Sequence, residues 1–291
     1  MLRNNDTFTR FCYIFIFLWV VIALFPFVYI FVVSVSDSTS IAAGKIISAE
    51  NTLSLASYKG LLLYAELGNS LFNSIVLSLT GTVLNMMFTI PCAYAISRKE
   101  TRAKNIIYGI LLLAMFFRGE IIPTYIWMSK LKLLDSYFAI WLSKLVSIYN
   151  ILILGKFFES LPQEAINAAK LDGAGPLTIL CKIAIPMSKG ALLSISILYL
   201  ASWWNDYYFT LVFIRSPHKY TLPVRIIQMI TNIEDSSVYC VQDSVYAKLS
   251  ACGVRAAGIV VSILPMLITI PLLQRNSSSL IKINKKKEKI S

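Results

Sequence analysis

The sequence has little charge: only 14% of its 291 residues are Asp, Glu, Lys or Arg. Soluble domains carry about a quarter charged residues, so this scarcity argues against an ordinary water-soluble domain. Hydrophobic residues make up 57% of the chain. The bilayer is therefore the expected solvent for most of the protein.

Residue types that usually carry catalysis are also scarce. The single histidine, His218, follows Pro217 in an expected loop, which argues against a histidine-based catalytic site. The five cysteines form no metal-binding pattern, and no GxxxxGK[ST] loop for nucleotide phosphates is present. We therefore expect neither an enzyme nor a bound metal or cofactor, and any ATP-driven work must come from a partner protein.

Long apolar segments dominate what is present, and about 20 such residues are enough to cross a bilayer. The longest uncharged segments are 11–36, 67–97 and 256–274, and three others are interrupted by Arg118 with Glu120, by Lys144 or by Asp206. The first is too long for a signal peptide and shows no obvious cleavage site. We predict an all-α membrane protein with six transmembrane helices, at about residues 11–36, 69–97, 105–128, 136–156, 190–214 and 254–274.

Lys and Arg are unevenly distributed between these spans. With a cytoplasmic N-terminus, sixteen fall in inside segments and nine in the longer outside loops, as expected because cytoplasmic loops carry the excess. Both termini are therefore expected inside: residues 1–10 precede the transmembrane domain 11–275, 157–189 form a cytoplasmic loop, and 276–291 form a basic tail near anionic lipid. The net charge of +12 then follows from topology, which leaves little support for nucleic-acid binding.

The cysteines fit this topology. Cys12, Cys92 and Cys181 fall in or near the spans and are expected to behave as small hydrophobic residues. Cys240 and Cys252 fall in or near the last outside loop, where two alternatives stay open, a disulfide and two free thiols.

The loop from Leu161 to Pro186 reads LPQEAINAAKLDGAGPLTILCKIAIP and carries helix signals. Ser160 is the expected N-cap, with Gln163 completing a capping box. Asp172-Gly173 predicts the end of the helix, because glycine readily takes the left-handed conformation. A second short helix is expected over 176–184.

The first of these helices is amphipathic. One face is apolar and the other is polar, through Pro162, Ala165, Ile166 and Ala169 on the first and Gln163, Glu164, Asn167 and Lys170 on the second. Small alanines would let another surface come close, as for a helix laid in a groove. Periodicity alone equally allows a helix resting on the lipid surface.

This loop resembles the cytoplasmic loop of binding-protein-dependent ABC transporter permeases, whose pattern is roughly E-A-A-x-x-x-G, nine residues, then I-x-L-P. The matching residues are Ala168, Ala169, Asp172, Gly173, Ala174 and Pro186. Asn167 stands where the pattern has Glu, although Glu164 lies one turn earlier. An Asn can hydrogen-bond but cannot form an ion pair, so the coupling contact is expected to be weaker or differently partnered.

Other motifs resemble the carbohydrate-uptake, maltose-type subgroup of these permeases, which imports oligosaccharides. They are Phe116-Phe117, Ile122-Pro123-Thr124-Tyr125, Leu133-Leu134-Asp135, residues 147–150 and Trp204-Asn205. The resemblance covers about residues 10 to 275. The tail NSSSLIKINKKKEKIS departs from the Gly-rich tail that is common in the family.

The resemblance implies a permease subunit of an ATP-driven importer in the bacterial cell membrane. It implies a second and different permease chain, two cytoplasmic ATPases and an extracellular solute-binding protein. It also implies that the loop residues Glu164, Asn167, Ala168, Ala169, Asp172, Gly173, Ala174 and Pro186 couple the permease to the ATPase. The alternatives are the same machine with a peptide or polyamine cargo, a self-contained secondary transporter, and a membrane enzyme; no inverted repeat is visible that would favour the secondary transporter.

Aromatic and polar residues in the later spans are candidates for the substrate path. Sugars stack their C–H faces on aromatic rings and need hydrogen-bond partners for their hydroxyls, and both are supplied by Trp204, Asn205, Asp206, Tyr207, Tyr208, Tyr149 and Asn150. The alternative is that they anchor helices at the interface or join helices to each other.

Arg118 has two interpretations. It forms a local pair with Glu120 near the outer interface, or it attracts a carboxylate of an acidic oligosaccharide. The sequence leaves the sugar, its charge and its length open.

Overall fold

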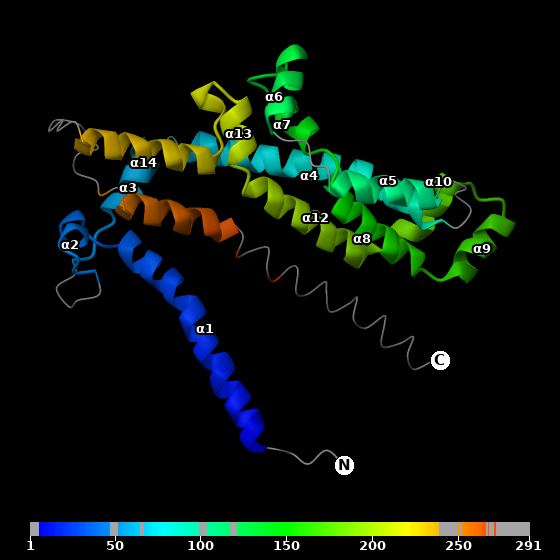
Figure 1. Cartoon of the computed structure of the whole chain (residues 1–291), viewed down its shortest axis with the longest axis horizontal. Coiled ribbons are helices and arrows are strands. Elements are labelled where there is room, and N and C mark those ends of the chain that lie inside the picture. The colour runs from blue at the N-terminus through cyan, green and yellow to red at the C-terminus, as the bar shows by residue number, and fades with distance from the viewer. Residues whose placement is uncertain are drawn as a thin grey trace. The chain divides into compact units, whose positions relative to one another are not determined.

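The computed structural model describes residues 6–46, 52–64, 67–98, 104–116, 121–238, 250, 252–265, 267 and 271. Within these residues the regular structure is helical, with one isolated antiparallel bridge between Ser36 and Leu53 (Figure 1). The prediction of an all-α fold is therefore confirmed.

Within the described residues, two helices are long and apolar enough to cross a membrane, and they coincide with the first two predicted spans. They are Thr9–Ser34, within α1 (Asp6–Ser34), and α4 (Leu67–Ser97). Three further spans are possible if each of three bent helix pairs crosses the membrane as one unit. The pairs are α5 (Lys104–Phe116) with α6 (Ile121–Lys130), α7 (Tyr137–Ser143) with α8 (Ile148–Glu159), and Pro176–Met187 with α12 (Lys189–Trp204).

The structure thus contains up to five spans by length and composition. The sixth predicted span, 254–274, overlaps the shorter apolar helix Cys252–Pro265, beyond which only positions 267 and 271 are described. The number six therefore stays a prediction.

The chain divides into two compact units, residues Met1–Gly68 with Arg225–Leu264 and residues Asn69–Val224 with Pro265–Ser291. The first contains α1, α2 (Ser38–Ala42), α3 (Ala56–Tyr64), most of α14 (Leu222–Val238) and the helix Cys252–Pro265. Between α1 and α3, the hydroxyls of Ser34 and Tyr58 hydrogen-bond over 2.8 Å. Most apolar side chains of α1 are exposed, as suits a helix surrounded by lipid.

Cys252 in this unit has a free thiol. Its partner in the disulfide alternative, Cys240, lies outside the described residues. Cys92 and Cys181 are exposed, and Cys12 is half-buried, so none of these three fills a buried apolar site within the chain.

The second unit holds the larger core and all the candidate site residues that the structure describes. Helix α8 packs against α5 and α12, and its buried side chains Ile151, Leu154 and Phe158 belong to this core. The short helix α13 (Tyr208–Phe213) packs against α7. The helices labelled α4, α8 and α12 in Figure 1 lie next to one another.

Helices α4 and α12 meet along residues spaced by four on each helix. A Cβ atom added to Gly81 would lie 2.4 Å from the Trp203 ring, so only glycine allows this approach. One turn further along α4, Asn85 accepts the indole N–H of the same Trp203 over 2.9 Å. A further turn on, the hydroxyls of Thr89 and Tyr199 lie 2.7 Å apart.

The break between α7 and α8 is supported by the same Asn85. The two helices are bent by 54°, which frees backbone carbonyls that would be costly to leave unpaired within a membrane. The Asn85 amide donates to the carbonyls of Lys144 and Leu145 over 2.7 and 3.1 Å. Ser147 then caps the new helix by accepting from the Asn150 N–H. The fourth predicted span is therefore interrupted at a defined and hydrogen-bonded position.

Candidate functional site

The predicted loop helix is present as α9 (Gln163–Leu171), but its start differs from the prediction. Pro162 is the N-cap and makes no side-chain cap hydrogen bond. Ser160 instead ends α8, and its hydroxyl donates to the Phe157 carbonyl. The predicted capping box of Ser160 and Gln163 is therefore wrong, because the end of α8 lies so close that Ser160 serves that helix.

The apolar face of α9 is partly covered by the chain itself. Ile166 is buried in the core and Ala169 packs against it. Pro162 on the same face is exposed and Ala165 is half-buried, so docking of this face in a groove stays a prediction. The exposed side carries Glu164, Asn167 and Ala168, so these side chains are the ones available to a partner.

The end of α9 is the predicted one. Gly173 has φ +79°, and its N–H donates to the Lys170 carbonyl while the Ala174 N–H donates to the Ala169 carbonyl, over 3.0 and 2.9 Å. This pair of bonds is the Schellman motif that ends many helices with a left-handed glycine. The loop tip is thus a fixed turn.

Beyond the turn the chain continues as α10 (Pro176–Ile179), a π-helical turn Leu180–Ala184 and α11 (Ile185–Met187). The second predicted helix is therefore present and continues past Pro186, which sits in the first turn of α11. This stretch meets α12 at 85°. Leu171 and Leu177, on either side of the turn, are 90% and 73% exposed, so the loop tip presents apolar as well as polar side chains.

A second site lies at the break between α7 and α8. A cavity of about 470 Å³ opens there, between α4, α5, α7, α8 and α12. Its polar and aromatic lining includes Asn85, Ser143, Lys144, Ser147, Tyr149, Asn150, Tyr199, Ser202 and Trp203. Two predicted path residues, Tyr149 and Asn150, therefore lie in its wall.

Lys144 is a charged residue of this wall, and no role is predicted for it from the sequence. Its ammonium group pairs with Asp206 over 3.0 Å and donates to the Ser202 carbonyl over 3.2 Å. It also lies 4.5 Å from the centroid of the Trp203 ring. Lys144 interrupts the fourth apolar segment, and this interruption was the signal in the sequence that could have identified it, since charged groups within spans are costly and usually functional.

The predicted cluster 204–208 is split by the structure. Asp206 is buried, pairs with Lys144 and accepts from Thr210 over 3.3 Å, and it is not among the cavity residues. Trp204 is buried and Tyr207 packs against the core, whereas Asn205 and Tyr208 are exposed. Arg118 and Glu120 lie outside the described residues.

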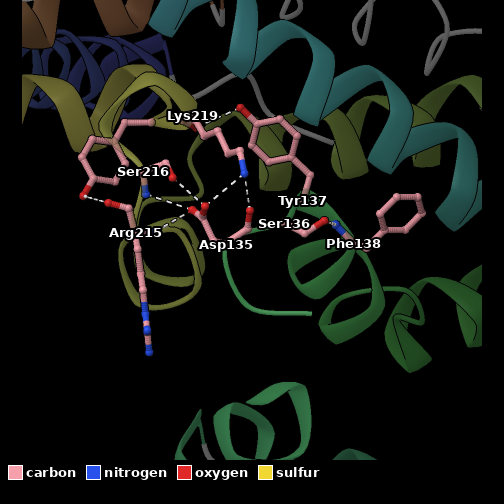
Figure 2. Close-up of polar contacts among 8 residues, drawn as sticks. Asp135, Ser136, Tyr137, Phe138, Arg215, Ser216 and Lys219 are labelled. Atoms are coloured by element: carbon pink, nitrogen blue, oxygen red, sulfur yellow. Dashed lines mark hydrogen bonds and ion pairs between the residues drawn. The ribbon is translucent and has the colours of Figure 1, made fainter. Parts of the chain in front are cut away.

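A third arrangement joins two loops expected on the outside (Figure 2). Asp135 has φ 60°, and one of its oxygens accepts from the N–H groups of Arg215 and Ser216 over 3.0 and 2.9 Å. The other accepts from the Ser216 hydroxyl over 2.5 Å and from Lys219 over 3.1 Å. The Ser216 hydroxyl, followed by the backbone N–H groups and Lys219, holds the pKa of the Asp135 carboxyl well below its usual range.

The Asp135 arrangement is reinforced by backbone contacts. The Asp135 N–H donates to the Phe213 carbonyl over 2.8 Å, and Tyr137 donates its hydroxyl to the Lys219 carbonyl over 2.9 Å. Figure 2 shows the Arg215 side chain directed away from Asp135, where its guanidinium donates to the Tyr125 hydroxyl over 2.8 Å. The α6–α7 turn and the loop 214–219 therefore form one fixed unit.

The sequence profile described as "Binding-protein-dependent transport system inner membrane component" matches residues 2–282 of the chain. The chain belongs to this family. The recognition made from the loop motif is thereby confirmed, and the relatives of this permease are transport subunits.

Two relatives come from Bacillus subtilis (strain 168). The permease is 29% identical over 225 residues to Protein LplC, covering 77% of this chain and 76% of LplC. It is 27% identical over 245 residues to the polygalacturonan/rhamnogalacturonan transport system permease protein YtcP, covering 81% and 82%.

A solved structure agrees with the fold. The permease is 29% identical to a chain in the crystal structure of a bacterial ABC transporter involved in the import of the acidic polysaccharide alginate. The TM-score is 0.82, over 94% of this permease and 98% of that chain.

Proposed function

We propose that this permease forms half of the membrane path of an ATP-driven importer for oligosaccharides derived from acidic polysaccharides. The observation that carries the proposal is the cavity at the α7–α8 break, which places Lys144 beside aromatic, amide and hydroxyl side chains. One relative is named for the transport of polygalacturonan/rhamnogalacturonan, and the similar solved structure is of a transporter involved in the import of the acidic polysaccharide alginate.

The cavity lining suits a sugar in its neutral parts. Tyr149, Tyr199 and Trp203 offer ring faces, and Asn85 and Asn150 offer amides. Such a combination of apolar surface with a few placed polar groups is typical of small-molecule sites. Lys144 adds the positive charge that a uronic-acid carboxylate requires.

The loop 157–189 is proposed to transmit the ATPase cycle. Closure of an ATP-bound ATPase dimer would move α9 and shift the permease between its two states, which requires one rigid contact. The fixed turn at Gly173 and the exposed Glu164, Asn167, Ala168 and Leu171 supply that contact. The remaining coupling candidates Ala169, Asp172, Ala174 and Pro186 would act by shaping the loop.

The partners follow from the family. They are a second permease chain, two ATP-binding subunits and an extracellular solute-binding protein, with both termini of this permease in the cytoplasm. Arg118 remains a candidate for attracting an acidic cargo.

The pairing of Lys144 with Asp206 favours a second candidate, a neutral oligosaccharide, because the pair already balances the charge. Uptake by the reconstituted complex, with its binding protein, separates the two. Unlabelled galacturonate oligomers and neutral malto-oligomers are each tested for how strongly they inhibit uptake of the cargo that the complex transports. Preferential competition by the acidic oligomers supports the proposal, and preferential competition by neutral oligomers supports the second candidate.

A further inference from the structure

A second cavity lies at the base of α9, on the side expected to face the cytoplasm. Its volume is about 620 Å³, and it is formed where α4 ends, α5 begins, α8 ends and α9 begins. The lining residues are Ser97, Arg98, Lys104, Lys156, Glu159, Gln163 and Asn167. Apart from Asn167, which also lies on the exposed side of α9, these residues belong neither to the cavity at the α7–α8 break nor to the proposed ATPase contact.

The described part of the wall carries an excess of positive charge. Within it, Arg98, Lys104 and Lys156 face one carboxylate, that of Glu159. Lys104 and Lys156 both bind Glu159, the latter over 3.0 Å. The hydrogen bond from Lys104, with that from Lys156, lowers the pKa of Glu159, so Glu159 is an anion and is fully engaged by the two lysines.

Arg98 takes no part in the ion pairs that Glu159 forms with Lys104 and Lys156. Its guanidinium lies 4.4 Å from the centroid of the Tyr94 ring, which holds it in place. Its Nε and Nη2 atoms are buried and find no hydrogen-bond partner among the residues that the structure describes. A buried donor without a partner is destabilising, and more so when it is charged, and such a group in a native protein requires an explanation.

We propose that this cavity binds a phosphate group, with Arg98 as its main contact. The planar guanidinium presents two N–H groups in the geometry that phosphate oxygens accept. Lys104 and Lys156 supply further charge, and the Gln163 and Asn167 amides supply neutral donors. The phosphate comes from the headgroup of an anionic phospholipid or from a free phosphate compound.

The expected position favours the lipid source. Basic pockets between helices on the cytoplasmic side of membrane proteins bind anionic headgroups. A bound phosphate would connect Arg98 at the end of α4 to Gln163 and Asn167 on α9. It would thereby brace the loop helix against the transmembrane part. This site goes beyond the proposed transport function, and its occupancy does not depend on the cargo.

Asn167 provides a sharp variant. It is exposed and lines the cavity, in the position where the resembled loop pattern has Glu. Asn167→Glu would place a carboxylate in the wall and offer Arg98 an internal partner. Binding of an external phosphate should then be lost without disturbance of the core.

The test uses the complete purified complex in nanodiscs. In nanodiscs of phosphatidylcholine alone, inorganic phosphate is titrated by calorimetry. In nanodiscs that also contain phosphatidylglycerol, the lipids that stay bound are identified by native mass spectrometry. The variants are Arg98→Gln and Asn167→Glu, and the matched control is Arg215→Gln, whose guanidinium lies on the outer loop against Tyr125.

We expect Arg98→Gln and Asn167→Glu to weaken phosphate or phosphatidylglycerol binding by roughly tenfold or more, and the control to leave it unchanged. Retention of phosphatidylglycerol without binding of inorganic phosphate identifies the lipid source, and the reverse identifies a free phosphate compound. Absence of both in the wild type overturns the proposal. An equal loss in Arg215→Gln overturns it too, because bulk charge would then explain the binding. Uptake measured on the same samples reports on the transport function separately.

Discussion

Trp203 and Asn85 form a buried hydrogen bond of 2.9 Å between α12 and α4. The same Asn85 side chain holds the carbonyls of Lys144 and Leu145 at the break in the fourth predicted span. One residue therefore joins three parts of the cavity wall at the α7–α8 break. The predictions below concern this cavity, the outer clamp around Asp135 and the loop that is proposed to contact the ATPase.

Gly81→Ala should destabilise the permease through a clash at this helix contact. The added Cβ would lie 2.4 Å from the Trp203 ring, which is fixed by Asn85. Overpacking of this kind costs about 1–3 kcal/mol. Gly109→Ala is the control, because nothing lies within 4 Å of its added Cβ. Thermal unfolding of the solubilised complex measures both, and equal stability of the two variants would contradict the packing account.

Lys144→Gln should reduce uptake of acidic oligosaccharides and should also lower stability. Removing one partner of a buried pair leaves the other charge uncompensated, which typically costs about 3–5 kcal/mol. The double variant Lys144→Gln with Asp206→Asn removes both charges and should recover much of that stability. Acidic uptake should stay low in the double variant while its fold is intact. Recovery of acidic uptake would show that Lys144 serves only the fold.

Asp135→Asn should loosen the outer clamp. An Asn amide cannot accept all the hydrogen bonds that the carboxylate receives from Ser216, Arg215 and Lys219. Charged hydrogen bonds of this type contribute about 1.5–3 kcal/mol when buried, and less here because the side chain is 30% exposed. Thermal unfolding at neutral pH should therefore show a modest decrease.

The pH dependence of that difference has a definite sign. Folding lowers the Asp135 pKa, so its contribution is fully present above the unfolded value of about 3.9. It is lost as the pH falls below that value towards the folded one. The stability gap between wild type and Asp135→Asn should be constant near neutrality and shrink below about pH 4. Asp135 stays ionised in both states at pH values about 2 units or more above the unfolded pKa. A stability gap that already shrinks between about pH 6 and pH 8 would therefore assign the effect to another group.

Gly173→Ala should weaken coupling. A side chain at φ +79° is strained by about 1–2 kcal/mol, and the Schellman turn would loosen. Gly173→Pro should abolish coupling, because proline also removes the N–H that binds Lys170. Gly175→Ala is the matched control, since it lies two residues on, with φ −71° and open space for a Cβ. Cargo-stimulated ATP hydrolysis in proteoliposomes, with membrane insertion checked, measures the coupling.

Ala168 tests docking of α9 more directly than Ala169, because part of the apolar face of α9 is buried. Ala169 packs against the core, so a bulky residue there disturbs the fold as well as docking. Ala168 is exposed, and Ala168→Trp should block coupling while stability is kept. Normal ATPase stimulation in Ala168→Trp would argue against docking through this side of α9.

The sequence predicted what depends on local signals. The long apolar runs predicted α1 and α4, and Asp172-Gly173 predicted the end of α9. Both signals are local, because apolar composition and a glycine that takes the left-handed conformation can be recognised within a short segment. The N-cap at Ser160 failed since α8 ends one residue before it. Ser160 lies between two helices and could cap either of them, and the local sequence does not show which one it caps.

The surroundings of the substrate-path candidates could not be predicted, because they depend on contacts between distant segments. Asp206 was chosen as an isolated charge in a span, yet its partner Lys144 lies 62 positions earlier. The cavity forms only when α4, α8 and α12 pack together around Asn85. Tyr149 and Asn150 lie in its wall because they follow the break directly, and their role in a substrate path stays a prediction.

The central claim is that this chain works as one subunit of an ATP-driven importer. The most direct measurement is mass spectrometry of the proteins that copurify with the tagged chain, extracted gently from its native membrane. The account predicts an ATP-binding subunit, a second permease and a solute-binding protein, in amounts comparable to the tagged chain. Recovery of the chain alone, or only with copies of itself, would contradict it.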